Sequence, residues 1–219
     1  MSALAPVAPG ETLRAFGVVP VVAVDDADQA LRLGATLLAA GLGIVEVTFR
    51  TPAAAGAIAA LTAGLPELVV GAGTLLAPDD VARAVDAGAA FGVAPGLSDP
   101  VVEAAAATGL PFVPGVATPS ELERAAAHGL DTLKLFPAEA VGGTALIDAL
   151  AGPYPRTSFM PTGGVRPENL AAYLSRPSVV ACGGTWIAPA ALLSAGDFDE
   201  VGRRAARAVA DVATVRPGS

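Results

Sequence analysis

One residue stands apart by its chemistry, because Lys134 is the only lysine in a chain that has twelve arginines. It lies inside an apolar segment, Thr-Leu-Lys-Leu-Phe, at positions 132–136. A guanidinium stays charged at every relevant pH, whereas a lysine removed from water can lose its proton and attack a carbonyl group to form a Schiff base. The apolar neighbours favour a reactive amine. The alternative is an ordinary surface lysine in a lysine-poor chain.

A carboxylate has similar surroundings, since Glu46 lies in the apolar segment Ile44–Thr48. Side chains alternate between the two faces of a strand, so Glu46 and Lys134 should both point away from the apolar side chains next to them. An unpaired buried charge is costly, and the two groups are therefore expected to lie close together. They would form either an acid/base pair for catalysis or a structural ion pair.

Two kinds of segment alternate along the chain. Short apolar runs bounded by glycine or proline have the length of buried parallel strands, and the longer Ala-, Leu-, Glu- and Arg-rich stretches have helix composition. The predicted strands are 18–24, 44–48, 68–72, 90–94, 111–113, 131–135, 157–160 and 178–182. The predicted helices are 11–16, 26–40, 52–63, 78–87, 99–107, 119–128, 167–174 and 198–212.

Eight strands alternating with helices predict an α/β protein with a single (β/α)8 TIM barrel over residues 1–219, preceded by a short N-terminal helix. An open doubly wound sheet is the alternative, but it would normally have a glycine-rich turn after its first strand, where this chain has Val24-Asp25-Asp26. In a barrel, the second and sixth strands lie opposite each other. Glu46 and Lys134 would then converge near the carboxyl ends of the strands, where active sites of this fold are built.

The composition limits the kinds of partner that the protein can bind. The formal net charge of −8 argues against nucleic acid or an anionic membrane. No apolar run reaches the length of a transmembrane helix, and residues 1–10 lack the basic start of a signal peptide. Cys182 is the only cysteine, which excludes an intrachain disulfide, fits a reducing cytoplasm and predicts a buried thiol.

Two glycine pairs follow the last two predicted strands, Gly163-Gly164 and Gly183-Gly184. Glycine lets backbone N–H groups approach a ligand, and the loops after the seventh and eighth strands of a barrel commonly bind phosphate. Arg50 follows the second predicted strand and can bind a carboxylate or phosphate, with an exposed arginine at a helix start as the alternative.

Seven segments spread along the chain have a familiar order: EVTFRT at 46–51, VGAGT at 70–74, APGL at 94–97, PGV at 114–116, LKLFPAE at 133–139, PTGGV at 161–165 and GGTW at 183–186. Through them the chain resembles the class I aldolase family of 2-keto-3-deoxy-6-phosphogluconate (KDPG) aldolase and 4-hydroxy-2-oxoglutarate (KHG) aldolase. The segments run through most of the chain, and their combination is far more specific than any one of them.

The resemblance implies that Lys134 forms the Schiff base and that Glu46 is the general acid/base. It also implies substrate-binding residues, namely Arg50 and Thr74 for the pyruvate end, Pro95 and Phe136 along the pocket, Thr162 beside the hydroxyl groups, and Gly163, Gly164, Gly183, Gly184 and Thr185 for the phosphate. Thr185 departs from the family pattern, because serine is expected there. Threonine keeps the hydroxyl group and adds a methyl group.

The implied enzyme is an aldehyde-lyase that needs no metal and no cofactor, acts on a small molecule and forms a homotrimer. Its expected reaction cleaves KDPG to pyruvate and glyceraldehyde 3-phosphate, with cleavage of KHG to pyruvate and glyoxylate also open. The galactonate epimer of KDPG is an alternative substrate, although related galactonate-series enzymes tend to have valine at the position of Thr162. The residues also leave room for a phosphate-binding isomerase without a covalent intermediate, or for a non-catalytic binding protein.

Overall fold

The structure is a computed structural model, and it describes residues 9–217. Its strands are β1 (Val18–Val22), β2 (Ile44–Thr48), β3 (Val69–Gly73), β4 (Phe91–Val93), β5 (Phe112–Val113), β6 (Gly115–Val116), β7 (Thr132–Leu135), β8 (Ser158–Phe159) and β9 (Cys182–Gly184). Its helices are α1 (Pro9–Phe16), α2 (Ala27–Ala39), α3 (Ala54–Gly64), α4 (Pro78–Asp86), α5 (Asp99–Thr108), α6 (Pro119–Ala127), the 3-10 turn η1 (Glu139–Val141), α7 (Gly143–Ala151), α8 (Pro167–Leu174), α9 (Ala190–Ala195) and α10 (Phe198–Val215).

Several helices begin or end at residues that provide caps. The side chain of Asp26 accepts a hydrogen bond of 2.7 Å from the backbone N–H of Gln29 at the start of α2. Thr118 and Glu121 form a reciprocal capping box at the start of α6, with Pro119 in the first turn. Gly109 ends α5 in the left-handed conformation, at φ 72°. These local signals explain why most helix positions could be predicted.

The strands form two parallel sheets among the described residues, a six-stranded sheet in the order β5-β4-β3-β2-β1-β9 and a three-stranded sheet in the order β6-β7-β8. The prediction of a closed eight-stranded (β/α)8 barrel is therefore wrong. One interruption lies at Pro114, between β5 and β6. Proline has no N–H to donate, and at this residue the chain changes its pairing partner from β4 to β7.

The second interruption lies between β8 and β9. Only isolated bridges, Phe159 to Val179 and Thr162 to Gly183, connect the chain around these two strands. The predicted strand at 178–182 is also misplaced, because the hydrogen-bonded strand is Cys182–Gly184. The second glycine pair thus lies within a strand and not in the loop after it.

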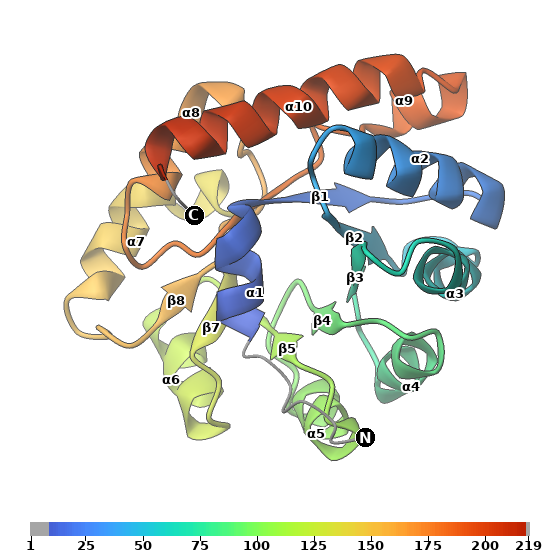
Figure 1. The fold of residues 1–219 in the computed structure, drawn as a ribbon. Helices are drawn as coiled ribbons and strands as arrows, with labels where there is room; N and C mark the ends of the chain where they lie inside the picture. Colours follow the sequence, from blue (N-terminus) through green and yellow to red (C-terminus); the bar gives the residue numbers. More distant parts are fainter. Residues whose placement is uncertain (1–8, 218–219) are drawn as a thin grey trace, which may run out of the picture.

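Figure 1 shows the strands on the inside and most helices around them, with α1 across the strands. The N-terminal turn of α1 lies against the start of β7, because a Cβ atom added at Gly10 would be 2.8 Å from the hydroxyl oxygen of Thr132. Valine, leucine and alanine side chains from strands and helices form one buried apolar cluster between the two layers. This cluster packs the strands against the helices around them.

The first and last predicted helices correspond to α1 and α10. Other elements differ from the prediction. Helices α7 and α9 and strand β6 were missed. Helix α7 starts from Gly142 and Gly143, which both have positive φ and provide no side-chain cap, and α9 has only six residues. Strand β6 consists of a glycine and a single valine, so it does not stand out as an apolar run.

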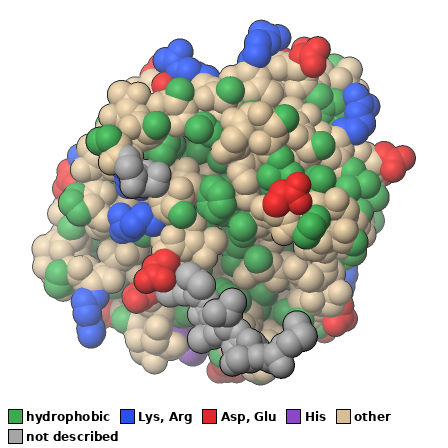
Figure 2. Space-filling view, viewed as in Figure 1, with side chains coloured by type: hydrophobic (Ala, Val, Ile, Leu, Met, Phe, Trp, Pro, Cys, Tyr) green, Lys and Arg blue, Asp and Glu red, His purple; other side chains and the backbone are tan. Residues whose placement is uncertain are grey.

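Acidic and basic side chains are scattered over the face seen in Figure 2 and do not gather in a single basic patch. Among residues 9–217, the longest helix has 18 residues, and no helix combines the length and apolar character needed to cross a bilayer.

Candidate active site

Lys134 and Glu46 meet inside the molecule. Lys134 comes from β7 and Glu46 from β2, and the Nζ atom of the lysine lies 3.3 Å from Oε1 of the glutamate. Both residues are buried, at 4% and 0% exposure. The Nζ atom also lies 5.5 Å from the ring centre of Phe136. The two charges thus converge from different sheets, as the alternation of side chains along each strand indicated.

The carboxylate of Glu46 has one oxygen bonded and one available. Its Oε2 atom is buried and has no hydrogen-bond partner within residues 9–217. A buried acceptor without a donor is costly, so this atom is suited to a hydroxyl group of a ligand. Room for the carboxylate comes from Gly73 at the end of β3, because an added Cβ there would be 2.1 Å from Oε1 of Glu46.

Arg50 lies just beyond the end of β2 and is tied to the same strand. Its Nε donates a hydrogen bond of 3.0 Å to the hydroxyl oxygen of Thr48, which itself donates to the carbonyl oxygen of Val22 at 2.7 Å. Thr48 is buried, whereas Arg50 is exposed. An arginine held in this way can bind a carboxylate with its remaining N–H groups.

These residues surround a cavity of about 240 Å³. Every substrate-binding residue predicted from the sequence lines it, apart from Gly184. The full lining consists of Val21, Glu46, Thr48, Arg50, Thr74, Pro95, Lys134, Phe136, Thr162, Gly163, Gly164, Val165, Gly183 and Thr185. Sequence reasoning missed Val21, Thr48 and Val165 as part of the site. Lys134 and Glu46 are buried deep in it, and Thr185 and Gly164 are exposed at its mouth.

Thr74 has an unusual backbone in the cavity wall. Its φ of 59° is left-handed, a conformation that non-glycine residues rarely adopt and that costs on the order of 1–3 kcal/mol. Such strain is kept where the surroundings fix the residue, and it is frequent at functional sites. Thr74 directly follows Gly73, the residue that makes room for the Glu46 carboxylate.

The two glycine pairs serve different purposes. Gly163 and Gly164 both have positive φ, at 95° and 84°, and both line the cavity. Gly183 also lines it, and an added Cβ there would be 2.2 Å from the hydroxyl oxygen of Thr162. At Gly184 the added Cβ would be 1.7 Å from the ring of Trp186. The need for glycine at this last position is explained by packing.

A group of residues below the loop at 162–164 holds it in place. The backbone N–H groups of Ala138 and Glu139 donate to the carbonyl oxygens of Thr162 and Gly163, at 2.8 and 3.0 Å. The Glu139 carboxylate accepts a hydrogen bond from the hydroxyl group of Tyr173. Burial, and then this carboxylate, raise the pKa of the Tyr173 hydroxyl, which stays a neutral donor.

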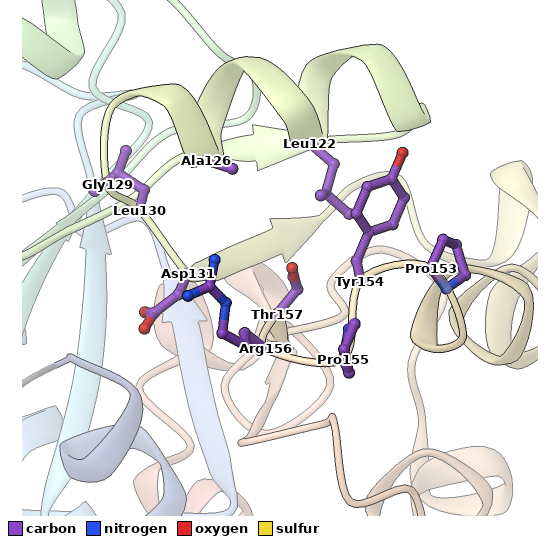
Figure 3. A pocket seen from close by; sticks show the side chains of 10 residues that line it. All are labelled: Leu122, Ala126, Gly129, Leu130, Asp131, Pro153, Tyr154, Pro155, Arg156 and Thr157. Atoms are coloured by element: carbon purple, nitrogen blue, oxygen red, sulfur yellow. The ribbon is translucent and has the colours of Figure 1, made fainter.

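A larger hollow, of about 470 Å³, lies at the opposite ends of the strands. Figure 3 shows that its lining comes from α6 and from the loops that precede β7 and β8. Its charged side chains, Asp131 and Arg156, are exposed, and it has no counterpart to the buried lysine and glutamate. We therefore take the smaller cavity as the candidate active site.

The described residues show neither a metal-ligand cluster nor an activated cysteine. Within residues 9–217, no three His, Cys, Asp or Glu side chains are grouped so that they could hold a metal ion. Cys182 is fully buried in β9, and burial raises the pKa of its thiol, which keeps it protonated and unreactive.

A buried lysine beside a buried carboxylate, in a cavity with an arginine and glycines at its edge, has the groups that carbonyl chemistry through a Schiff base requires. Comparison with known proteins agrees with this class. The family model for KDPG and KHG aldolase matches residues 10–204. The chain belongs to the KDPG and KHG aldolase family.

Two curated relatives and one solved structure show how close the similarity is. The chain is 44% identical over 191 residues to a 2-dehydro-3-deoxy-phosphogluconate aldolase of Treponema pallidum, covering 87% of this chain and 91% of the relative. It is 43% identical over 192 residues to the KHG/KDPG aldolase of Escherichia coli K12, covering 88% and 90%. A crystal structure of KDPG aldolase from Legionella pneumophila, with pyruvate captured as a covalent carbinolamine intermediate, superposes with a TM-score of 0.88 at 34% identity and covers 91% of this chain and 97% of that one.

Proposed function

We propose that the protein is a class I aldolase that cleaves KDPG to pyruvate and glyceraldehyde 3-phosphate. The observation that carries the proposal is the contact of 3.3 Å between the buried Nζ of Lys134 and the carboxylate of Glu46. The carboxylate can take a proton from the amine and return it to a leaving group, and the amine can attack a ketone.

The proposed reaction begins with attack of the Lys134 amine on the C2 ketone of the substrate. Loss of water, with Glu46 transferring the protons, gives an iminium ion. Glu46 then removes the proton of the C4 hydroxyl group, the C3–C4 bond breaks, and its electrons enter the iminium to form an enamine. Glyceraldehyde 3-phosphate leaves. Protonation of the enamine and addition of water release pyruvate and restore the amine.

The remaining cavity residues orient the two ends of the substrate in this proposal. Arg50 and Thr74 bind the carboxylate next to the ketone, which fixes the ketone for attack. Pro95 and Phe136 line the middle of the pocket. Thr162 lies beside the hydroxyl groups of the substrate. Gly163, Gly164, Gly183 and Thr185 bind the far end, where backbone N–H groups and a hydroxyl group suit a phosphate. We do not include Gly184 in this group, since Trp186 accounts for it.

KHG is a second substrate within the same proposal. Both compounds present the same 2-keto acid to Lys134 and differ only at the far end, and one of the relatives bears both activities in its name. Thr162 favours KDPG over its galactonate epimer, since a hydroxyl group there can contact the substrate's hydroxyl groups. Turnover of KDPG and of the epimer, compared under the same conditions, tests this preference.

Borohydride trapping tests the Schiff base directly. The protein is incubated with pyruvate and borohydride, and its intact mass and peptide map are measured. One pyruvate-derived addition on Lys134 is expected. Lys134→Arg serves as the control, because arginine cannot form the imine, and this variant should show neither the addition nor turnover.

An absent adduct in folded protein would overturn the covalent mechanism. It would instead favour an isomerase that acts without a covalent intermediate, or a binding protein. An adduct confined to the N-terminal amine, the only other amine that could react, would have the same meaning.

We also propose that residues 1–219 act as one domain, in the cytoplasm and as a homotrimer. The single contiguous core supports one domain, and the lone cysteine supports the cytoplasm. The family resemblance supports the trimer. Light scattering of the purified protein would test the trimer.

A further inference from the structure

The hydroxyl group of Thr48 links Arg50 to the neighbouring strand. It donates to the carbonyl oxygen of Val22 in β1 at 2.7 Å and accepts from Nε of Arg50 at 3.0 Å. Thr48 is 1% exposed and lies in the cavity wall. Because the hydroxyl proton is donated to Val22, the oxygen faces the arginine as an acceptor, and the direction of the contact is fixed.

A second threonine fixes the backbone on the other side of the arginine. The hydroxyl group of Thr51 donates to the carbonyl oxygen of Val24 at 2.7 Å. Thr48 and Thr51 thus bracket Arg50 and attach the end of β2 to the chain that runs on from β1. Of the two hydroxyl groups, only that of Thr48 also contacts the guanidinium.

We infer that Thr48 is a positioning residue that sets the plane of the Arg50 guanidinium for the carboxylate of a 2-keto acid. Arg50 is exposed, and a free arginine side chain samples many rotamers. A hydrogen bond to Nε leaves the N–H groups of both terminal nitrogens for the two oxygens of a carboxylate. The inference rests on the proposed function, since it assumes a substrate carboxylate at Arg50.

The test compares Thr48→Val with Thr51→Val. Valine has nearly the shape of threonine, and each variant loses one hydroxyl bond of 2.7 Å to a carbonyl oxygen, but only Thr48→Val loses the contact with Arg50. The pyruvate concentration that half-saturates borohydride trapping is measured for each. Thr48→Val should raise it roughly tenfold, the effect of one lost charged hydrogen bond, and Thr51→Val should change it much less. Thr48→Ser, which keeps the hydroxyl group, should restore the wild-type value.

Acetone provides the readout that a purely structural role would not give. It has a methyl group where pyruvate has its carboxylate, so it can form an imine without using Arg50. Thr48→Val should lower trapping of pyruvate relative to acetone. In an Arg50→Met background, which has no guanidinium and adds no second lysine, adding Thr48→Val should have no further effect on pyruvate.

Three results would overturn the inference: an unchanged half-saturating pyruvate concentration in Thr48→Val, an equal loss for pyruvate and acetone, or the same loss in the Arg50→Met background. If Thr48→Val does not fold, Thr48→Ala against Thr48→Ser makes the same comparison. Failure of the proposed function is a separate result, because wild-type protein would then trap no pyruvate at all.

Discussion

The missing side chain at Gly73 gives the Glu46 carboxylate its position. An added Cβ would lie 2.1 Å from Oε1, so Gly73→Ala must displace the carboxylate from Lys134. Displacing a catalytic group by an ångström costs about 100-fold in rate, and we expect kcat to fall by that order with a smaller change in KM. Steady-state kinetics with KDPG would measure it.

Gly56 provides the control for this substitution. It lies in α3, and an added Cβ there meets no atom of residues 9–217 within 4 Å. Gly56→Ala should therefore keep wild-type kinetics. A Gly73→Ala variant with wild-type kcat would show that the exact place of the carboxylate does not matter.

At the residue scale, the sequence could identify groups whose chemistry conflicts with their neighbours. Lys134 and Glu46 stand out as charges within apolar strands, and their contact follows from alternation along each strand. Gly73 and Thr48 give no such signal, since glycine and threonine are common in strand ends and loops. Their importance depends on distances to residues of other strands, which a single sequence does not contain.

At the scale of elements, α8 supports the loop proposed to bind phosphate. Its Tyr173 donates to Glu139 of η1, and an added Cβ at Gly164 would be 2.5 Å from Cγ of Glu139. Tyr173→Phe should release this support and raise KM for glyceraldehyde 3-phosphate roughly tenfold in condensation with pyruvate. With glyceraldehyde, which has no phosphate, KM should stay the same.

Tyr154→Phe is the matched control for that experiment. The hydroxyl group of Tyr154 also donates to a carboxylate, that of Glu123 at 2.8 Å, but it lies beside the hollow in Figure 3, away from the cavity. Equal losses for both aldehydes in Tyr173→Phe would mean a general disturbance and no selective support of the phosphate loop.

The cap of α6 predicts a pH dependence of stability. The backbone N–H of Ala117, and then Thr118, donate to the Glu121 carboxylate and lower its pKa below the ordinary value. The ionised form is thus favoured by folding, so its contribution is present above the unfolded pKa and is lost as pH falls through the folded one.

Glu121→Ala measures this contribution. At pH 7 the free energy of unfolding should fall by about 1 kcal/mol, the usual effect of a lost cap. As the pH falls below about 4, the difference from wild type should shrink. Urea unfolding at the two pH values would check it, and a difference that grows in acid would contradict the assignment.

Most helices and strands could be predicted, including the two-residue strands β5 and β8 and helix α3, whose start has no side-chain cap. Helices α7 and α9 and strand β6 could not. Helix α6 has proline and a capping box in its first turn, whereas α7 starts from two glycines. The last strand was misplaced because the short apolar run at 178–182, bounded by proline and glycine, suggested a strand. The observed strand contains Gly183 and Gly184, which have low strand propensity but are needed next to Thr162 and Trp186.

At the scale of the whole molecule, Arg216 anchors the C-terminal helix. Helix α10 packs on α2 and α8, and Figure 1 shows it along the outside of the structure. Just after it, the Arg216 guanidinium donates to the carbonyl oxygens of Leu174, Val179 and Val180, at distances from 2.7 to 3.1 Å. Burial lowers the pKa of this guanidinium from its usual value.

Arg216→Lys cannot make this set of bonds, because an ammonium lacks the planar fork. The melting temperature should fall, by about 2–4 °C for each kcal/mol lost in a chain of this size. Arg207→Lys is the control, since Arg207 pairs with Asp211 on the exposed surface and such pairs contribute little. Thermal unfolding followed by circular dichroism compares them, and an equal fall in both variants would exclude a special role for Arg216.

The alternation of strands and helices predicted an α/β protein, but it did not predict that the strands form two separate sheets. Whether neighbouring strands complete a ladder depends on local details such as the missing N–H of Pro114 and the two-residue length of β8. A pattern of apolar runs predicts the number of strands, but it does not predict which strands pair by hydrogen bonds.

The division of the strands into two sheets affects how activity responds to heat. Glu46 belongs to the six-stranded sheet and Lys134 to the three-stranded one, so their contact of 3.3 Å depends on how the sheets are placed relative to each other. A small rigid shift of one sheet would separate the amine from its proton acceptor while every backbone ladder stayed intact. Warming the protein should accordingly abolish catalysis at a lower temperature than the one at which its secondary structure melts, and a covalently trapped pyruvate, held by groups from both sheets, should narrow that interval.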